Sequence, residues 1–207
     1  MQSLVLATRN QSKLRELKEV LGDLPVQVLS LEGHDNLPEP EETGLTFADN
    51  ARLKAQYYAQ ATGCWCLADD SGLVVDALDG APGVYSARYA AQQCPPDADR
   101  HTIDQANNRK LLAALQGVPD EQRTARFVCH LVLASPERVL IETFDTVEGR
   151  IGYEARGQNG FGYDPLFFIP EMGCTTAELP SDKKHAISHR GKAVRHFAGL
   201  LKHFLRK

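Results

Sequence analysis

Apolar residues along the chain alternate between strand-like and helix-like spacing. Short apolar runs bounded by turn-forming residues predict buried strands over residues 3–8, 26–31 and 65–68. After the first run, Leu14, Leu17 and Leu21 recur at helical spacing, so a helix is predicted there, with Gly22 after its end. A second helix is predicted from Thr46, which can cap its first turn, to about residue 62.

The second half of the chain predicts one helix, a block of strands and a final helix. The helix covers residues 99–116, and the β-rich segments are 125–134, 139–146 and 147–151. The inner face of the last helix is predicted to consist of Ala193, Phe197, Leu200, Leu201 and Phe204. Alternating helices and strands followed by strands indicate an α/β domain with a mixed sheet.

Composition narrows the class of protein. The chain has 207 residues and a net charge of −4, which argues against bulk binding of nucleic acid. Its longest early apolar stretch, residues 4–7, is too short for a signal-peptide core or a membrane span. Five scattered cysteines without a CxxC pair favour reduced thiols in a cytosol over disulfides or a zinc site.

The segment Ala68-Asp-Asp-Ser-Gly-Leu73 is the first candidate for chemistry. We expect the predicted strand at 65–68 to end here, so that Asp69, Asp70 and Ser71 are held out towards a ligand. An ordinary polar turn has the same composition. Aspartic proteases pair two Asp-Ser-Gly segments, whereas this chain has one. A carboxylate beside a metal ion can instead act as a general base.

Two further motifs precede that segment. Thr8-Arg9-Asn10-Gln11-Ser12-Lys13 lies between a predicted strand and a helix, where free backbone N–H groups, hydroxyls and the Lys13 charge suit a phosphate. The sequence is not a Walker A loop, and helix capping explains the same residues. Glu42 lies in an acidic loop and could complete a Mg²⁺ site with Asp70; a solvated loop is the alternative.

Two motifs follow it. The loop Gly157–Pro165 contains Phe161-Gly162-Tyr163-Asp164, in which Phe161 can stack on a base, although a hairpin turn also uses such residues. The run from Lys183 to Lys192 is basic in an acidic protein, and it suits either a nucleotide or a solvated helix start.

Taken together and in this order, the five motifs resemble the inosine triphosphate pyrophosphatase family, and the match extends over nearly the whole chain. The resemblance implies hydrolysis of dITP, ITP and XTP to the monophosphate and pyrophosphate, with Mg²⁺ as cofactor. It also implies one domain over 1–207, with an elongated twisted mixed β-sheet flanked by helices and two lobes around a central substrate cleft. A cytoplasmic homodimer is expected, with no nucleic acid or membrane as partner.

The resemblance also implies a role for each residue. Asp70 is expected to accept a proton and, with Glu42, to serve the metal, while Asp69 assists. The expected substrate-binding residues are Thr8, Arg9, Asn10, Gln11, Ser12, Lys13, Ser71, Phe161, Gly162, Tyr163, Asp164, Lys184, His189 and Arg190. His189 and Arg190 are expected near the purine 6-oxo edge, where donors would exclude adenine.

Three other functions stay open at this stage. A related pyrophosphatase could prefer modified pyrimidines, although the Phe161 loop and the segment Ser188-His189-Arg190 favour a purine. A nucleotide-binding module without turnover would gain little from placing Glu42, Asp69 and Asp70 beside phosphates. An aspartic protease would leave Lys13 and the basic run unexplained.

Overall fold

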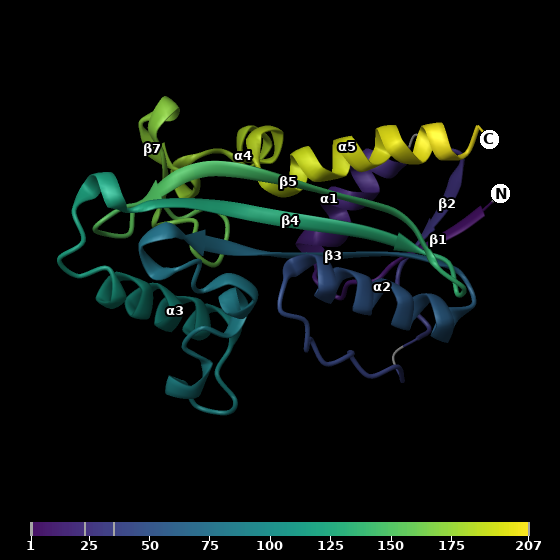
Figure 1. Cartoon of the computed structure of the whole chain (residues 1–207), viewed down its shortest axis with the longest axis horizontal. Coiled ribbons are helices and arrows are strands. Elements are labelled where there is room, and N and C mark those ends of the chain that lie inside the picture. The colour runs from purple at the N-terminus through teal and green to yellow at the C-terminus, as the bar shows by residue number, and fades with distance from the viewer. Residues whose placement is uncertain (1, 23, 35, 207) are drawn as a thin grey trace. The chain divides into compact units, whose positions relative to one another are not determined.

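The computed structural model describes residues 2–22, 24–34 and 36–206, apart from the side chains of Gln11, Ser12 and Glu16 (Figure 1). The chain forms two compact units. The first unit comprises Met1–Ser71, Cys129–Asp145 and His189–Lys207, and the second comprises Gly72–Val128 and Thr146–Ser188.

The described residues form one mixed sheet in the order β2-β1-β3-β4-β5-β6-β7. Its strands are β1 (Gln2–Leu6), β2 (Val26–Leu29), β3 (Trp65–Val75), β4 (Thr124–Ala134), β5 (Val139–Ile151), β6 (Phe167–Ile169) and β7 (Cys174–Thr175). β1 runs parallel to both β2 and β3, whereas β6 is antiparallel to β5 and β7. The predicted α/β fold with a mixed sheet flanked by helices is confirmed.

In the first unit, helices cover both faces of the sheet. α1 (Gln11–Leu21) and α5 (His189–Phe204) pack on one face, and α2 (Phe47–Thr62) packs on the other (Figure 1). The alternation of side chains along β1 supplies both layers, because Leu4 and Leu6 join the α1–α5 core while Val5 and Ala7 join the α2 core.

The second unit has its own apolar core beneath α3 (Arg100–Ala114), and it also contains the short helix α4 (Ser181–Ile187). The rings of Phe127 and Phe167 lie 4.5 Å apart in this core. Arg123 is only 2% exposed, and its guanidinium donates to the carbonyl oxygens of Leu115, Ile151 and Gly152 at 2.8–2.9 Å. These bonds satisfy a buried cation with main-chain acceptors.

Several local predictions are confirmed by the helix termini. Thr46 caps α2 by accepting a hydrogen bond from the Asp49 amide at 3.1 Å, and the helix ends at Gly63 in the left-handed conformation (φ 67°). Asn10 caps α1, since its Oδ1 accepts from the Lys13 amide at 3.3 Å. On α5, Ala193, Phe197 and Leu201 are buried as predicted. The prediction for Leu200 is wrong, because it is 38% exposed.

The main correction concerns Asp69-Asp70-Ser71-Gly72. This segment is not a turn at a strand end; it lies within the 11-residue strand β3. Likewise, residues 139–151 form one strand rather than two, and β6, β7 and α4 were not predicted. Pairing with neighbouring strands outweighs the local turn preference of Asp, Ser and Gly.

The five cysteines carry free thiols. Burial raises the pKa of Cys66 to about 11 and that of Cys129 to about 12, so these two thiols are inert near neutral pH. Among the described residues, no helix has the length and apolar character needed to span a bilayer.

Candidate active site

The site in the first unit lies where the sheet changes its direction of winding. β1 is central between β2 and β3, and the crossover helices α1 and α2 lie on opposite faces. Ligands of open α/β sheets bind at the carboxyl ends of the strands at such a switch point. The β1–β3 pairing ends at Leu6 and Leu67, so β1 no longer accompanies β3 along Asp69–Ser71.

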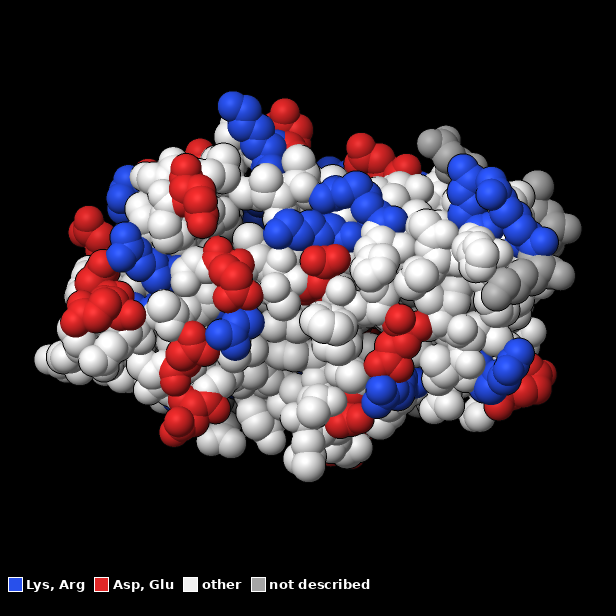
Figure 2. Space-filling model, turned by 45° about the horizontal axis from the view of Figure 1, so that its top comes forward, with Lys and Arg blue, Asp and Glu red and all other residues white. Residues whose placement is uncertain are grey.

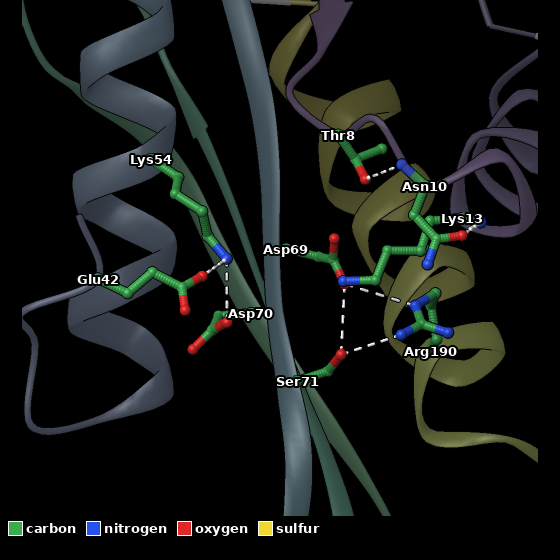
Figure 3. A network of polar contacts seen from close by, with 9 residues as sticks. All are labelled: Thr8, Asn10, Lys13, Glu42, Lys54, Asp69, Asp70, Ser71 and Arg190. Carbon is green, nitrogen blue, oxygen red and sulfur yellow. Dashed lines mark hydrogen bonds and ion pairs between the residues drawn. The ribbon is translucent and has the colours of Figure 1, made fainter. Parts of the chain in front are cut away.

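The alternation of side chains along β3 separates the two adjacent carboxylates. Leu67 belongs to the core under α1 and α5, whereas Cys66 and Ala68 belong to the core under α2. Asp69 and Ser71 therefore lie on the α1–α5 face, and Asp70 lies on the α2 face (Figure 3). One strand thus presents a carboxylate to each side of the sheet.

Asp69 is the counter-ion of two cations. Lys13 Nζ lies 2.8 Å from Asp69 Oδ2, and Arg190 Nε lies 3.5 Å from the same oxygen. Arg190 also donates from Nη2 to Ser71 Oγ at 2.9 Å (Figure 3). β3, α1 and α5 are thereby joined at one point, since Lys13 lies in the first turn of α1 and Arg190 in the first turn of α5.

The charge on Asp69 is strongly favoured although the residue is only 4% exposed. Burial on its own raises the pKa of this carboxyl, but the Lys13 ammonium and the Arg190 guanidinium outweigh it and hold the pKa well below its usual range. Two cations against one carboxylate leave an excess of positive charge, which can meet an anionic ligand.

Asp70 shares a cation with Glu42 on the other face of β3. Lys54 Nζ donates to Glu42 Oε1 at 2.7 Å and to Asp70 Oδ1 at 2.9 Å (Figure 3). The second oxygen, Asp70 Oδ2, is buried and has no hydrogen-bond partner among the described residues. A buried carboxylate oxygen left in this way costs free energy, and it can accept a proton or bind a cation.

Burial also perturbs the pKa values of this group. Desolvation raises the pKa of Asp70, and the Lys54 ammonium opposes the rise without cancelling it. Burial lowers the pKa of Lys54, but Asp70, Asp69 and Glu42 outweigh that effect and raise it. Lys54 is therefore a permanent cation beside a carboxylate of increased basicity.

A buried amide anchors the loop that carries Glu42. Asn50 is fully buried on α2, and its Oδ1 accepts from the Gly44 amide at 2.8 Å. A Cβ atom on Gly44 would lie 2.6 Å from that oxygen, so the loop and α2 are too close for a larger residue. Only Thr43 separates this anchor from Glu42, so the loop is held to α2 close to that carboxylate.

The segment before α1 is ordered by its own polar groups. Thr8 Oγ1 accepts from the Asn10 amide at 3.2 Å, so this turn leads directly into the capped first turn of α1 (Figure 3). Free N–H groups of a helix N-terminus favour anions. Arg9 instead donates to the Leu37 carbonyl at 2.8 Å. The side chains of Gln11 and Ser12 lie outside the described residues.

The C-terminal helix adds positive charge to the first unit. α5 begins at the half-buried His189, continues with Arg190 and contains no Asp or Glu. In the upper half of the view in Figure 2, Lys and Arg side chains form one group near the middle and another towards the right-hand end. The charge of α5 contrasts with the net charge of −4 of the whole chain.

The remaining predicted residues lie in the second unit. Asp164 is buried, forms an ion pair with Lys184 and accepts from the Phe161 amide at 2.7 Å. Lys184 Nζ also lies 5.2 Å from the centre of the Phe161 ring. Tyr163 is buried, and its hydroxyl donates to the Ser86 carbonyl at 2.9 Å. Within this loop Phe161 is 40% exposed, so its ring is accessible to a ligand.

The structure thus forms three groups of predicted residues, two in the first unit and one in the second. Glu42 and Asp70 share Lys54 on the α2 face of β3. Lys13, Asp69, Ser71 and Arg190 are in direct contact in the first unit, and Phe161, Asp164 and Lys184 are in contact in the second.

Sequence reasoning missed Lys54. A signal for it existed, since Lys54 lies on the stripe of α2 that includes the buried Ala51, Ala55 and Tyr58. A lysine at such a position requires a buried partner.

Together, the switch point, the carboxylates of β3 and the cations that α1, α2 and α5 place beside them define an α/β protein suited to an anionic ligand. Comparisons with known proteins extend this description. The Ham1 family model matches residues 4–200. A dITP/XTP pyrophosphatase of Geobacter sulfurreducens is 52% identical over 194 residues, 94% of each chain. A protein of the same name from Exiguobacterium sibiricum is 50% identical over 202 residues, 98% of each chain.

Solved structures agree with the sequence comparison. A HAM1 protein from Coxiella burnetii matches with a TM-score of 0.88 at 41% identity and covers 98% of this chain and 100% of that one. A nucleoside-triphosphatase / dITP/XTP pyrophosphatase from Mycobacterium abscessus matches with a TM-score of 0.78 at 42% identity, covering 97% and 100%. The chain belongs to the Ham1 family.

Proposed function

We propose that this protein is a Mg²⁺-dependent nucleoside-triphosphate pyrophosphatase. Its substrates are the non-standard purine nucleotides dITP, ITP and XTP, which it hydrolyses to the monophosphate and pyrophosphate. The observation that carries this proposal is Asp70, whose pKa is raised by burial and whose Oδ2 lacks a hydrogen-bond partner among the described residues. The names of the relatives at 50–52% identity support the same activity.

The donor set fits a magnesium ion. Mg²⁺ prefers hard oxygen ligands and needs only one or two carboxylates when substrate phosphates and water complete its shell. Glu42 and Asp70 supply such oxygens, and the unpaired Asp70 Oδ2 is available without breaking a contact. The described residues contain no cluster of three or more His, Cys, Asp or Glu side chains that could hold a metal, so the site depends on the substrate.

When bound by Glu42 and Asp70, Mg²⁺ would neutralise negative charge on the phosphate oxygens. Asp70 accepts a proton from the water that attacks the α-phosphorus, and its raised pKa suits this role. The bond from the α-phosphorus to the bridging oxygen breaks, and pyrophosphate leaves. Lys13 and Lys54, the two ammonium groups that contact Asp69 and Asp70, stabilise the charge on the phosphates.

Asp69 has a different role in this proposal. Its charge is already satisfied by Lys13 and Arg190, so it serves to orient these two cations. Arg190 is buried against Asp69 and Ser71, which leaves His189 as the residue assigned to the purine 6-oxo edge. A donor there rejects the 6-amino group of adenine.

The loop of the second unit is assigned to the base. Phe161 is exposed and stacks on the purine, while Gly162, Tyr163, Asp164 and Lys184 hold the loop in shape. The homodimer and the cytoplasmic location expected from the family resemblance stay predictions.

The decisive test is pyrophosphate release from ITP, dITP, XTP, GTP, ATP and dTTP, each with and without Mg²⁺. Release from the first three alone, and only with Mg²⁺, supports the proposal. Release from dTTP would retain the chemistry and contradict the purine assignment. Binding of ITP without any release would contradict the enzymatic function and favour a nucleotide-binding module.

A further inference from the structure

Helix α3 holds both main-chain polar groups of Gly162. The Gly162 amide donates to Asp104 Oδ2 at 2.9 Å, and Asn108 Nδ2 donates to the Gly162 carbonyl at 2.9 Å. Asp104 and Asn108 are one helical turn apart and therefore share a face of α3. Gly162 lies in the left-handed region (φ 63°), where a glycine needs external contacts to keep one conformation.

The acceptor for this loop is a buried carboxylate that is itself held in place. Asp104 is 8% exposed, and its Oδ1 lies 2.9 Å from Arg100 Nε. Arg100 in turn donates from Nη1 to the Ala87 carbonyl at 3.3 Å. Burying a carboxylate costs free energy, which its hydrogen bonds offset. The bond from the Gly162 amide to the ionised Asp104 is charge-assisted and therefore stronger than a bond between neutral groups.

The other side of the loop is fixed by Asp164. This carboxylate accepts from the Phe161 amide at 2.7 Å, and Thr176 Oγ1 donates to its Oδ1 at 2.9 Å. A Cβ atom on Gly160 would lie 2.1 Å from Asp164 Oδ2, so the chain on either side of Phe161 is closely confined. The Phe161 side chain, in contrast, is 40% exposed.

We propose that Asp104 and Asn108 are positioning residues that hold the loop 160–164 so that Phe161 is ordered before a nucleotide binds. This inference rests on the proposed function, because it takes Phe161 as the residue that stacks on the base. Without the two contacts, binding has to order the loop as well, and that cost weakens affinity without altering the bound chemistry. KM for ITP therefore rises about tenfold or more while kcat changes little.

The test uses Asp104→Ala and Asn108→Ala with two comparison variants. Asp104→Asn keeps an oxygen that can accept from Gly162, and Arg109→Ala alters an exposed residue of the same helix. Inhibition by IMP reports on the base, whereas inhibition by inorganic triphosphate reports on the phosphate site alone. In both positioning variants we expect weaker IMP inhibition and unchanged triphosphate inhibition. Asp104→Asn should recover most of the affinity, and Arg109→Ala should resemble the wild type.

Equal weakening of IMP and triphosphate inhibition, or loss of kcat at constant KM, would overturn the inference. Hydrogen–deuterium exchange over residues 160–164 separates this outcome from a failure of the proposed function. Faster exchange in the two alanine variants, with unfolding temperatures near that of the wild type, supports the positioning role even if ITP is not hydrolysed. Unchanged exchange contradicts it whatever the activity.

Discussion

Asp69 and Asp70 are neighbours in the chain, yet their carboxylates point to opposite faces of β3. On one face Asp69 contacts Lys13 and Arg190. On the other face Asp70 contacts Lys54, which it shares with Glu42 (Figure 3). The first carboxylate has its pKa lowered by cations and the second has its pKa raised by burial. Two identical side chains thus have opposite pKa shifts, which fits the proposed function, in which Asp69 orients cations and Asp70 accepts a proton.

Replacing Asp70 with Asn should remove most turnover and leave the fold intact. The change removes the general base and one metal ligand together, so we expect kcat to fall by roughly 10²–10⁴-fold. The raised pKa means that ionised Asp70 is unfavourable in the folded state. The protonated form of Asp70 is the one that the folded state favours. The stability that it contributes is present below about pH 4 and is lost as the pH rises through the folded pKa. Thermal unfolding at pH 7 should accordingly show no loss of stability, and full activity would refute the assignment.

Asp69→Asn is the matched variant, with the opposite expectation for stability. It leaves Lys13 and Arg190 without their shared buried counter-ion, which costs about 3–5 kcal/mol of unfolding free energy. Because the folded pKa is lowered, this contribution is present above about pH 4 and is lost as the pH falls further. Denaturant unfolding of the wild type and of Asp69→Asn should show a difference in unfolding free energy at pH 7, and this difference should become smaller in acid. A difference in unfolding free energy that does not depend on pH would contradict the ion-pair explanation.

Lys54→Met should shift the pH dependence of the reaction. Removing the cation leaves Glu42 and Asp70 to repel each other, which raises the pKa of Asp70 further. The acid limb of the kcat/KM profile, which reports the free enzyme, should therefore move to higher pH. Lys202→Met, at an exposed position of α5, is the control and should keep the wild-type profile. An unshifted profile in Lys54→Met would show that another group limits the rate in acid.

Phe161→Ala should weaken substrate binding with little effect on folding. Base–aromatic stacking contributes about 1–3 kcal/mol, so KM should rise roughly 5- to 150-fold. The ring is 40% exposed, which limits the loss of packing. Steady-state kinetics with ITP and a thermal unfolding curve measure the two effects separately. Phe161→Tyr keeps the stacking surface and should remain close to the wild type; an unchanged KM in Phe161→Ala would exclude the stacking role.

Local rules in the sequence determined much of the secondary structure. Thr46 predicted the start of α2, Asn10 capped α1, and the mixed α/β architecture followed from the order of apolar segments. These features depend on contacts within a few residues, which sequence spacing describes directly. The motifs also indicated a shared role in metal binding for Glu42 and Asp70, which stays a prediction; in the structure both carboxylates contact Lys54.

Tertiary structure alone decided how the site is assembled. Residues 69–72 continue β3 because neighbouring strands pair with it, although Asp, Ser and Gly prefer turns on their own. The partners of the two carboxylates come from distant segments: Arg190 lies 121 residues from Asp69, and Lys54 lies 16 residues from Asp70. Sequence spacing shows that adjacent strand residues face opposite ways. Which helix covers each face is settled only when the crossovers pack, and that packing places each carboxylate beside its own cation.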